Sequence, residues 1–389
     1  MELEYWWLLA FPLFFALGWL AARIDIQQII SQSKQLPESY FKGLNFLLNQ
    51  QPDKAIEAFT EAAKANAETI ELHFTLGGLF RRRGEVDRAI QLHQALVDRP
   101  DLGREQRLVA QFELGQDFLK AGLLDRAEAL FKALENTPHT EQALRALMEI
   151  YVQEKEWRQA ITIAERLGTI SSHPFQIEIT HFLCELAVTE SVTGNYAAAR
   201  KYLEEALSNN RRNVRANILL GDFAAAEHQH EEALSIWRGV ETQQPSYLAL
   251  VAAKMQASYK AVDRAAEGLG VLKNYLMNYA SIDLLNIVYQ ATLEFEGMEA
   301  ANLLVREELR RHPTLEGFEK LLEALLFEVS VEKRQDIQIF KTLIHKHSQR
   351  LAYYQCDACG FKARQFYWRC PACVAWETFP PRRIEESAS

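Results

Sequence analysis

The chain lacks an excess of positive charge. Its 389 residues carry a formal net charge of −9. A protein dedicated to nucleic acid needs a basic face that displaces counterions from the phosphates, so we expect no nucleic acid among its partners. Apolar residues make up 48% of the chain and charged residues 24%, as in an ordinary folded protein with a hydrophobic core. The composition therefore excludes a disordered chain.

The sequence also lacks the short motifs that mark common catalytic sites. It contains no HExxH, no P-loop, no GxGxxG and no nucleophile elbow. The ten histidines are scattered, and His228 and His230 are two residues apart, a spacing that places them on different faces of a helix. His181 and Cys184 are interpreted as core residues. We predict no catalytic residues, no organic cofactor and no enzymatic activity.

Long apolar runs are scarce, and the one that stands out is the uncharged stretch 5–22. Its 18 residues are at the short end of what a spanning helix needs. A cleaved signal peptide would need a positive start, whereas this chain begins with Met-Glu-Leu-Glu and its first cation is Arg23. The positive-inside rule then predicts an uncleaved, single-pass anchor with everything after Arg23 in the cytoplasm. A buried N-terminal helix is the alternative.

Cysteines are few as well, and the five present do not form the pattern of a secreted disulfide framework. Four occur as Cys356-x-x-Cys359 and Cys370-x-x-Cys373, with ten residues between the pairs. The spacing within each pair lets both of its sulfurs bind the same ion, and Gly360 supplies the positive φ that such a turn favours. Four thiolates suit zinc or a single iron, so we predict one metal ion held by these four cysteines. A redox-active disulfide pair is the alternative.

A closed set of four protein ligands has no open position for catalysis. Its role is then to fold a segment that is too small to hold itself together. Electron transfer by iron is a further alternative, although nothing else in the chain resembles a redox partner. Four nearby aromatic residues are expected to pack this domain against the last helices: Tyr367, Trp368, Trp376 and Phe379.

Small residues recur at a regular period in the body of the chain. Four glycines are each followed twelve positions later by an alanine: Gly43 and Ala55, Gly77 and Ala89, Gly115 and Ala127, Gly221 and Ala233. With weaker copies at Ala160 and Ala199, the alanines are 34, 38, 33, 39 and 34 residues apart. This is the period of the tetratricopeptide repeat, in which two antiparallel helices cross where side chains are small. An unrelated helical bundle with chance spacing is the alternative.

These patterns predict an all-α tetratricopeptide-repeat solenoid with an N-terminal transmembrane helix and a small C-terminal metal domain. Residues 246–348 match the repeat poorly, and we expect two or three further helix pairs there. The predicted divisions are an anchor at 1–22, a juxtamembrane linker at 23–36, tetratricopeptide repeats at 37–245, divergent helical repeats at 246–350, the four-cysteine domain at 351–382 and a tail at 383–389.

Charge is unevenly distributed along the chain. Residues 341–383 carry a local +6, whereas residues 1–340 carry −13. We therefore expect the basic end to fold back on the acidic body, with Lys362 and Arg364 holding it there. Two arginine groups are candidates for contact with acidic ligands, although most such runs are solvated faces: Arg81, Arg82 and Arg83, and Arg211, Arg212 and Arg215.

The anchor, the repeats and the cysteine pairs, in this order, closely resemble the lipopolysaccharide assembly protein B family over essentially the whole chain. The matching segments are GLNFLL at 43–48, TLGGLF at 75–80, RGEVDRAI at 83–90, CELA at 184–187, RHPT at 311–314, CGF at 359–361 and YWRCPACVAW at 367–376. The cysteine turns are also similar to those of rubredoxin. Their spacer is much shorter than in a true rubredoxin, and Val374 stands where the second rubredoxin turn has glycine, which disfavours electron transfer.

The resemblance implies a regulator of lipopolysaccharide synthesis in the bacterial inner membrane. Family members couple the membrane-bound AAA+ protease FtsH to LpxC, the deacetylase at the committed step of lipid A synthesis, so that LpxC is degraded. An inner-membrane lipopolysaccharide sensor opposes them. The partners that the resemblance implies are FtsH, LpxC, this sensor and the membrane itself. A homodimer with a second copy of the chain is a further expectation.

By the same resemblance, Cys356, Cys359, Cys370 and Cys373 are the metal ligands, and the membrane segment near residues 5–22 engages the protease. A scaffold that gathers envelope-synthesis enzymes without directing proteolysis is the alternative function.

Overall fold

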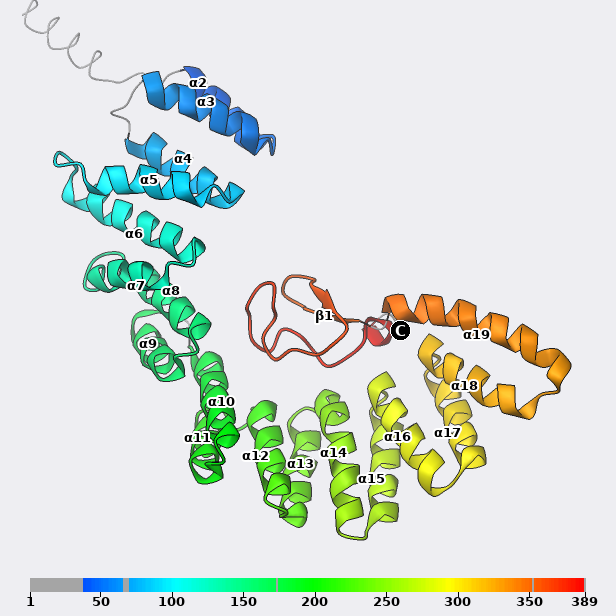
Figure 1. The fold of residues 1–389 in the computed structure, drawn as a ribbon. Helices are drawn as coiled ribbons and strands as arrows, with labels where there is room; N and C mark the ends of the chain where they lie inside the picture. Colours follow the sequence, from blue (N-terminus) through cyan, green and yellow to red (C-terminus); the bar gives the residue numbers. More distant parts are fainter. Residues whose placement is uncertain (1–37, 66–69, 173, 352, 388–389) are drawn as a thin grey trace, which may run out of the picture. The chain divides into compact units, whose positions relative to one another are not determined.

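The computed structural model describes residues 38–65, 70–172, 174–351 and 353–387. These residues form nine antiparallel helix pairs followed by a small two-stranded domain (Figure 1). The all-α tetratricopeptide architecture with a C-terminal metal-binding ribbon is confirmed. The predicted anchor and juxtamembrane linker lie outside the described residues. Among the helices of the described part, none is both long enough and apolar enough to cross a membrane.

The helix pairs follow one another directly along the chain, each with a first helix (A) and a second helix (B). Their bounds are α2 (Glu38–Leu48) and α3 (Pro52–Ala65), α4 (Ile70–Arg83) and α5 (Val86–Val97), α6 (Arg104–Lys120) and α7 (Leu124–Ala133), α8 (Thr140–Gln153) and α9 (Trp157–Ile170), α10 (Gln176–Val192) and α11 (Tyr196–Asn209), α12 (Val214–Ala226) and α13 (His230–Gln243), α14 (Leu248–Ala261) and α15 (Ala265–Asn278), α16 (Ile282–Phe295) and α17 (Met298–Arg311), and α18 (Leu315–Glu328) and α19 (Val331–Leu351). A short 3₁₀ helix, η2 (Pro245–Tyr247), precedes α14.

The chain divides into two compact units, residues 1–150 and 151–389. In the first unit, one buried cluster joins α3, α4 and α5 around Phe59, Leu72 and Phe80. In the second unit, a larger cluster extends from α12 to α17, with Trp237 and Tyr259 among its buried side chains. Each unit therefore buries apolar side chains between neighbouring helix pairs, as stacked repeats require.

The small residues of the predicted period lie where the helices of each pair cross. The six alanines are fully buried, at 0% exposure: Ala55, Ala89, Ala127, Ala160, Ala199 and Ala233. The glycines of helix A face a ring from helix B. A Cβ atom on Gly115 would lie 2.8 Å from the Phe131 ring, and one on Gly221 would lie 2.3 Å from Trp237 Nε1. A side chain at the glycine position would clash with the facing ring, and the alanine position has no exposed surface. Glycine and alanine therefore recur at the repeat period.

Residues 246–348 continue the array with three further pairs, as expected. Here the alanine position is taken by Gly268 and then by Ala301, which is also fully buried. Gly268 lacks a side chain because Tyr259 of helix A fills the crossing, and a Cβ on Gly268 would lie 2.7 Å from Tyr259 Cβ. Gln256 replaces the helix A glycine, twelve residues before Gly268, so the repeat signature fades while a close crossing at Gly268 persists.

The turn between the two helices reverses through a single residue with positive φ in eight of the nine described pairs. These residues are Gln50, Gly84, Gly122, Lys155, Gly194, His228, Asp263 and Gly297. In seven of these eight turns the amide of the following residue bonds back across the turn, as from Leu123 N to Phe118 O (2.9 Å), in the Schellman pattern that ends many helices. In the eighth, Gly297 N itself donates to Thr292 O. Half of these residues are not glycine, so glycine positions alone reveal only half of the turns.

Candidate metal centre

The C-terminal ribbon, residues 353–387, begins with a short hairpin. Strand β1 (Tyr354–Gln355) pairs antiparallel with β2 (Lys362–Ala363), so that Tyr354 lies opposite Ala363. The hairpin loop carries Cys356 and Cys359. The second cysteine pair follows in a loop closed by a bridge between Arg369 and Trp376, and the chain ends in the short helix α20 (Ile384–Ser387). Both cysteine pairs therefore sit in turns rather than on helices.

The two cysteine turns have the same backbone bonding. In the first turn, Cys356 N donates to Phe361 O at 2.9 Å and Gly360 N donates to Cys356 O at 2.9 Å. In the second, Cys370 N donates to Ala375 O and Val374 N donates to Cys370 O, both at 2.9 Å. The equivalence holds although the two sequences share little beyond their cysteines.

The residue after the second cysteine of each turn has positive φ. Gly360 adopts +74° and Val374 adopts +56°. Glycine tolerates this conformation, but a β-branched residue is strained in it. The second turn therefore adopts the geometry of the first against the preference of its own sequence, which indicates that the four sulfurs and the fold around them impose it.

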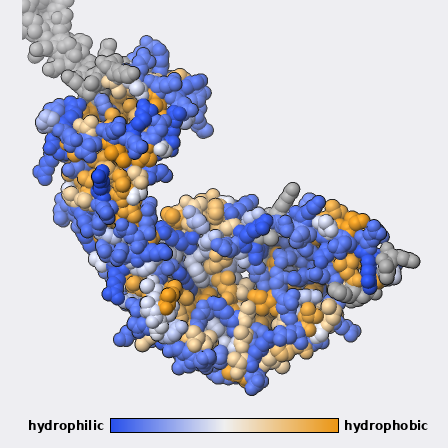
Figure 2. Space-filling view, viewed as in Figure 1, coloured by the Kyte–Doolittle hydropathy of each residue, from blue (hydrophilic) through white to orange (hydrophobic). Residues whose placement is uncertain are grey.

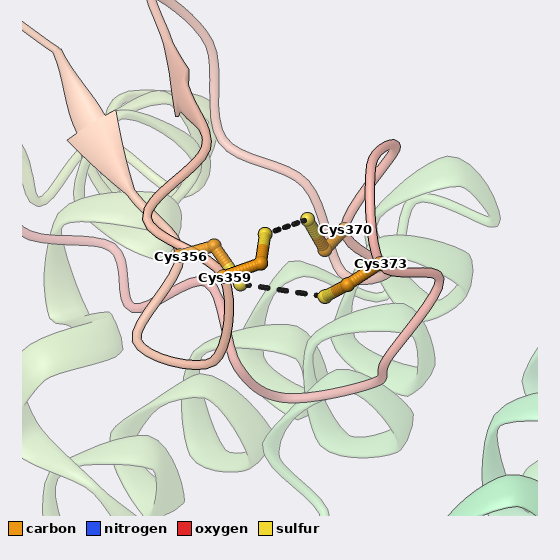
Figure 3. A group of neighbouring side chains, drawn as sticks. All are labelled: Cys356, Cys359, Cys370 and Cys373. Atoms are coloured by element: carbon orange, nitrogen blue, oxygen red, sulfur yellow. Dashed lines mark hydrogen bonds between the residues drawn. The ribbon is translucent and has the colours of Figure 1, made fainter. Parts of the chain in front are cut away.

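The four sulfur atoms converge, as Figure 3 shows. Cys356 Sγ lies 3.7 Å from Cys373 Sγ, and Cys359 Sγ lies 3.7 Å from Cys370 Sγ. All four lie within 4.8 Å of one another. A disulfide would bring two sulfurs to about 2 Å, whereas a tetrahedron with metal–sulfur bonds of about 2.3 Å has edges of about 3.8 Å. The arrangement fits a tetrathiolate metal site and excludes paired disulfides as the state described here.

Acidity within the cluster is uneven. Burial acts to raise the pKa of the Cys356 thiol, but the Thr378 hydroxyl, 3.3 Å from its sulfur, and the amides of Cys359 and Ala358 outweigh it, so this pKa falls to about 6. The Phe361 amide favours the Cys359 thiolate, but desolvation and the three neighbouring sulfurs prevail and raise the pKa of Cys359 to about 12. Negative charge on one sulfur thus opposes charge on the next, and a cation is needed to hold all four as thiolates.

The ribbon is docked on the second unit through Trp376 and Glu377. The Trp376 ring stacks on His181 of α10, with ring centroids 4.4 Å apart and planes 9° from parallel. His181 Nε2 and Asn213 Nδ2 both approach Glu377 Oε1, at 3.0 and 3.3 Å. Burial lowers the pKa of His181, against the opposing effect of Glu377. The imidazole is therefore neutral and donates its Nε2 proton to the carboxylate.

A second docking contact involves Trp368, which stacks on Tyr247 of η2 with centroids 5.4 Å apart. Arg215 lies against both indoles, 5.8 Å from the Trp368 centroid and 5.7 Å from that of Trp376. Its guanidinium also bonds to Glu185 Oε1 at 2.7 Å. The arginine therefore connects two helices of the array to the ribbon by cation–π and charge-assisted contacts.

The third contact lies near the end of the chain. Arg383 Nη2 donates to Asp283 Oδ1 of α16 at 2.8 Å, and the Tyr354 hydroxyl donates to Asp283 Oδ2 at 2.5 Å. Glu385 accepts a hydrogen bond from Leu315 N at the first turn of α18. Residues of the predicted tail are thus in contact with two helices of the array.

The structure confirms that the basic end folds back on the array, but the residues expected to hold it there were wrong. Within the described residues, neither Lys362 nor Arg364 forms a hydrogen bond or ion pair with a helix of the array, whereas Arg383 of the ribbon pairs with Asp283 of α16. Trp368 and Trp376 contact η2 and α10 rather than the last helices.

Two further expectations are corrected by the same contacts. Tyr367 and Phe379 pack inside the ribbon, with Cys356, rather than against helices. Cys184 is a core residue as expected, at 0% exposure, but His181 is buried by the ribbon as well as by helices. Sequence reasoning missed His181, Asn213 and Glu377 as a docking set because their spacing along the chain carries no pattern.

The arginine candidates are largely occupied within the molecule. Arg81 pairs with Asp117 at 2.7 Å and also with Glu113 of the next repeat. Arg83 pairs with Asp53 and Glu85, and Arg215 belongs to the ribbon contact. Arg82, Arg211 and Arg212 are exposed. The expectation of a ligand-binding arginine run is therefore not supported at Arg81 or Arg215, whose charges hold the array together.

Comparison with known families agrees with this architecture. A rubredoxin metal-binding domain matches residues 354–381, and tetratricopeptide repeats match residues 42–102 and 184–247. Over 378 residues, 96% of this chain and 97% of the relative, the sequence is 34% identical to the lipopolysaccharide assembly protein B of Escherichia coli strain K12. The chain belongs to the lipopolysaccharide assembly protein B family. The family's protein from Haemophilus influenzae is 30% identical over 97% of this chain and 98% of that protein.

Solved structures resemble the chain more distantly. A chain of the Naa15/Naa10 complex bound to HypK-THB is 13% identical with a TM-score of 0.40, covering 81% of this chain and 47% of that chain. A tetratricopeptide repeat protein from Parabacteroides merdae is 15% identical with a TM-score of 0.27, covering 74% and 97%. Neither score supports an inference about this member of the lipopolysaccharide assembly protein B family.

Proposed function

We propose that this chain is a non-enzymatic adaptor that regulates lipopolysaccharide synthesis at the bacterial inner membrane. Residues 5–22 anchor it, its body faces the cytoplasm, and it brings the LpxC deacetylase to the membrane protease FtsH for degradation. An inner-membrane lipopolysaccharide sensor opposes this activity.

The observation that carries the proposal is membership of the lipopolysaccharide assembly protein B family over 96% of the chain. The repeat-built body supports it, because stacked helix pairs present extended surfaces to protein partners. Tethering an array of this kind to the membrane would also raise the effective concentration of its partners around a membrane protease. An adaptor role is consistent with both features.

The four-cysteine centre has a structural role in this proposal. Cys356, Cys359, Cys370 and Cys373 would hold one zinc or iron ion, and the bound ion would supply the free energy that folds the ribbon. The folded ribbon then presents Trp376 and Glu377 to the array. The centre thus folds the ribbon and takes no part in a chemical step.

Depletion of the protein in cells with active FtsH tests the adaptor role. Quantitative immunoblotting should show that LpxC accumulates, and re-expression of the full chain should restore the low level. Deacetylase levels that stay flat, while another FtsH substrate is still degraded, would eliminate the adaptor role.

Pull-down from the same membranes distinguishes the adaptor from the alternative function, a scaffold. Recovery of several envelope-synthesis enzymes without FtsH would favour a scaffold that does not direct proteolysis. An iron-dependent redox role makes a different prediction, because a zinc-loaded chain could not replace the iron-loaded one. The redox alternative would be removed if the chain restores function in depleted cells while the protein isolated from those cells contains zinc and no iron.

Membrane attachment is tested separately. The full chain should remain with the membrane after alkaline carbonate extraction, whereas a chain lacking residues 1–22 should be released. A reporter fused after the C-terminus should be active only if the reporter functions in the cytoplasm. Release of the full chain by carbonate would contradict the anchor.

A further inference from the structure

The helix α2, at the start of the described array, carries apolar side chains on two faces. Its inner face brings Tyr40, Phe46 and Leu47 against the core cluster of the first unit. A second row on the same helix is exposed and has the spacing of one helix face: Phe41 at 54%, Leu44 at 36% and Leu48 at 81% exposure. These three residues form the α2 stripe. A surface helix usually carries one apolar face, so a second one indicates a second contact.

The α2 stripe is unusual for its positions in the repeat. Figure 2 shows hydrophobic residues at the surface of the first unit in several places, so exposure alone does not identify a contact. The stripe residues stand two before, one after and five after the helix A glycine, Gly43. The next two repeats hold other residues at these positions: Thr75, Gly78 and Arg82, and then Glu113, Gln116 and Lys120. The repeat architecture therefore does not itself require apolar side chains there.

The position of Phe41 faces the preceding helix A elsewhere in the array. Its equivalent in the third repeat, Glu113, accepts a hydrogen bond from Arg81 of the preceding helix A at 2.5 Å. Its equivalent in the sixth repeat, Leu219, packs on a cluster that includes Leu183 and Leu186 of the preceding helix A, α10. The partner of Phe41 is therefore expected in the chain that precedes α2.

The sequence just before α2 contains a matching apolar row. Residues 24–34 read IDIQQIISQSK, in which Ile26, Ile29 and Ile30 have the spacing of one helix face. A helix of these 11 residues would be about 16 Å long, the length of α2, which also has 11 residues. Pro37 disfavours a helical conformation at the residue before it, so the chain can reverse there.

We propose that residues 24–34 form an amphipathic helix that packs on the α2 stripe. Ile26, Ile29 and Ile30 contact the stripe, and residues 35–37 form the turn. The connection is short, so the two apolar rows meet at an effective concentration in the millimolar range. The proposal does not rest on the adaptor role, because it concerns only how the chain before α2 packs. Together with the proposed anchor at 5–22, this helix would connect the membrane stiffly to the first repeat.

Other occupants fit the α2 stripe less well. Three partly exposed side chains offer at most a few hundred Å², whereas a stable interface between separate chains buries about 800 Å² on each partner. This area disfavours a second copy or a separate protein. A helix that binds anionic lipids carries an excess of lysine or arginine. The charged residues of α2 are Glu38 and Lys42, which pair with each other at 3.1 Å, so α2 has no such excess.

Hydroxyl-radical footprinting of the full chain in neutral detergent micelles tests the packing. Phe340 on α19 is the internal reference, because its ring is 57% exposed against 54% for that of Phe41. If residues 24–34 cover the stripe, Phe41 should be labelled at least about threefold more slowly than Phe340, because contact with the isoleucines removes its access to water.

Two sets of substitutions in residues 24–34 locate the cover. The triple variant Ile26→Ser, Ile29→Ser and Ile30→Ser should raise the labelling rate of Phe41 to within about twofold of that of Phe340, because the apolar contact is lost. The matched control substitutes serine on the other faces of the same helix: Gln27→Ser, Gln28→Ser and Gln32→Ser. It should leave Phe41 protected. Circular dichroism should show that the array is folded in both variants.

Photocrosslinking in membranes identifies the occupant. With p-benzoylphenylalanine in place of Ile29, mass spectrometry should find an internal crosslink to residues 41–48. The same photoreactive residue in place of Gln28 should not give this product, because it lies on another face of the helix.

Several results would overturn the proposal. One is labelling of Phe41 at the rate of Phe340 in the unsubstituted chain, and another is equal protection of Phe41 in the isoleucine and glutamine variants. Protection that appears only with anionic phospholipid vesicles would identify a lipid surface as the occupant. Crosslinks from position 29 to a second copy, or to a different protein, in place of α2 would identify that chain instead.

Discussion

The helix array and the ribbon of the second unit are stabilised in opposite ways. The array buries apolar side chains at every crossing, and its core cluster alone runs from Val214 to Val305. The ribbon has four buried side chains in its own cluster, and two of them are cysteines. Loss of one contact in the array therefore leaves many other buried contacts in place, whereas the stability of the ribbon depends on one metal centre and three docking contacts.

Removal of the metal should have the largest effect, because it should unfold the ribbon and leave the array folded. Apparent metal-binding free energies of small zinc domains are about 10–16 kcal/mol, far more than four buried side chains supply to the ribbon. With a strong chelator, or in Cys370→Ser, we expect residues 353–387 to be cleaved rapidly in limited proteolysis while far-ultraviolet circular dichroism of the array is retained. Loss of helical signal in parallel would show that array and ribbon fold as one.

Removal of one docking ring should separate ribbon folding from ribbon docking. Trp376→Ala deletes the stack on His181, and we expect it to weaken docking by about 2 kcal/mol, as for an aromatic residue at the centre of an interface. The metal content should stay at one ion per chain while proteolysis of the ribbon accelerates. Phe361→Ala is a suitable control, because its ring contacts Phe379 within the ribbon. Equal acceleration by both variants would contradict a specific docking role.

Substitution at a crossing should test the array. A Cβ on Gly221 would lie 2.3 Å from Trp237 Nε1, whereas one on Gly270 would meet nothing within 4 Å. Gly221→Ala should destabilise the chain by about 1–3 kcal/mol through overpacking. Gly270→Ala, in the middle of α15, should stabilise it by about 0.5–1 kcal/mol. Thermal denaturation of the metal-loaded chain distinguishes them, and a shift of the same sign for both would contradict the crossing.

Acid should weaken docking through His181. Its pKa is lowered in the docked state, mainly by burial, with Arg215 adding to the decrease and Glu377 and Glu185 opposing it. The released ribbon leaves this histidine free to bind a proton, so docking is fully stable above pH 6.5 and loses stability as the pH falls below that value. The protection factor of the Trp376 amide, which corrects for the slower intrinsic exchange in acid, should fall below this pH. His181→Phe keeps an aromatic ring for the stack but cannot bind a proton. Any pH dependence of docking that remains in this variant measures the contribution of the cysteines.

Relief of strain in the second cysteine turn should have the smallest effect. Val374 has a φ of +56°, which costs a β-branched residue about 1–2 kcal/mol. Glycine removes this cost but adds flexibility to the unfolded chain, which offsets about 0.5–1 kcal/mol. Val374→Gly should therefore slow metal release to a chelator by a few-fold, and Ala372→Gly should not. Faster release from Val374→Gly would show that the valine is not strained.

Sequence could predict the array because its packing repeats. The crossings at Gly43, Gly115 and Gly221 all exclude a side chain, so one physical requirement recurs at a fixed period. The pattern failed at Gly268, where Gln256 stands in place of the helix A glycine and Tyr259 fills the crossing, because close packing depends on the sum of two side chains and not on either position alone. The cysteine turns were equally visible, since both sulfur pairs have to be local to chelate one ion.

Sequence could not predict where the ribbon docks. His181 and Glu377 are 196 residues apart, and their contact depends on how ten helices place α10 near the end of the chain. Net charge suggested attraction between a basic end and an acidic body, yet Glu377 is an acid on the basic end. Stacked rings and a few hydrogen bonds determine the contact, and the net charges of the two segments carry no information about them.

Hydrogen–deuterium exchange of the full chain, with and without its metal, distinguishes a metal-folded ribbon on a stable array from a single folding unit. We expect metal removal to expose the amides of residues 353–387 and of the docking face around His181, Asn213 and Tyr247. The core amides of α12 to α15 should remain protected. Uniform loss of protection across the second unit, or a ribbon that stays protected without metal, would contradict a metal-folded ribbon docked on an independently stable array.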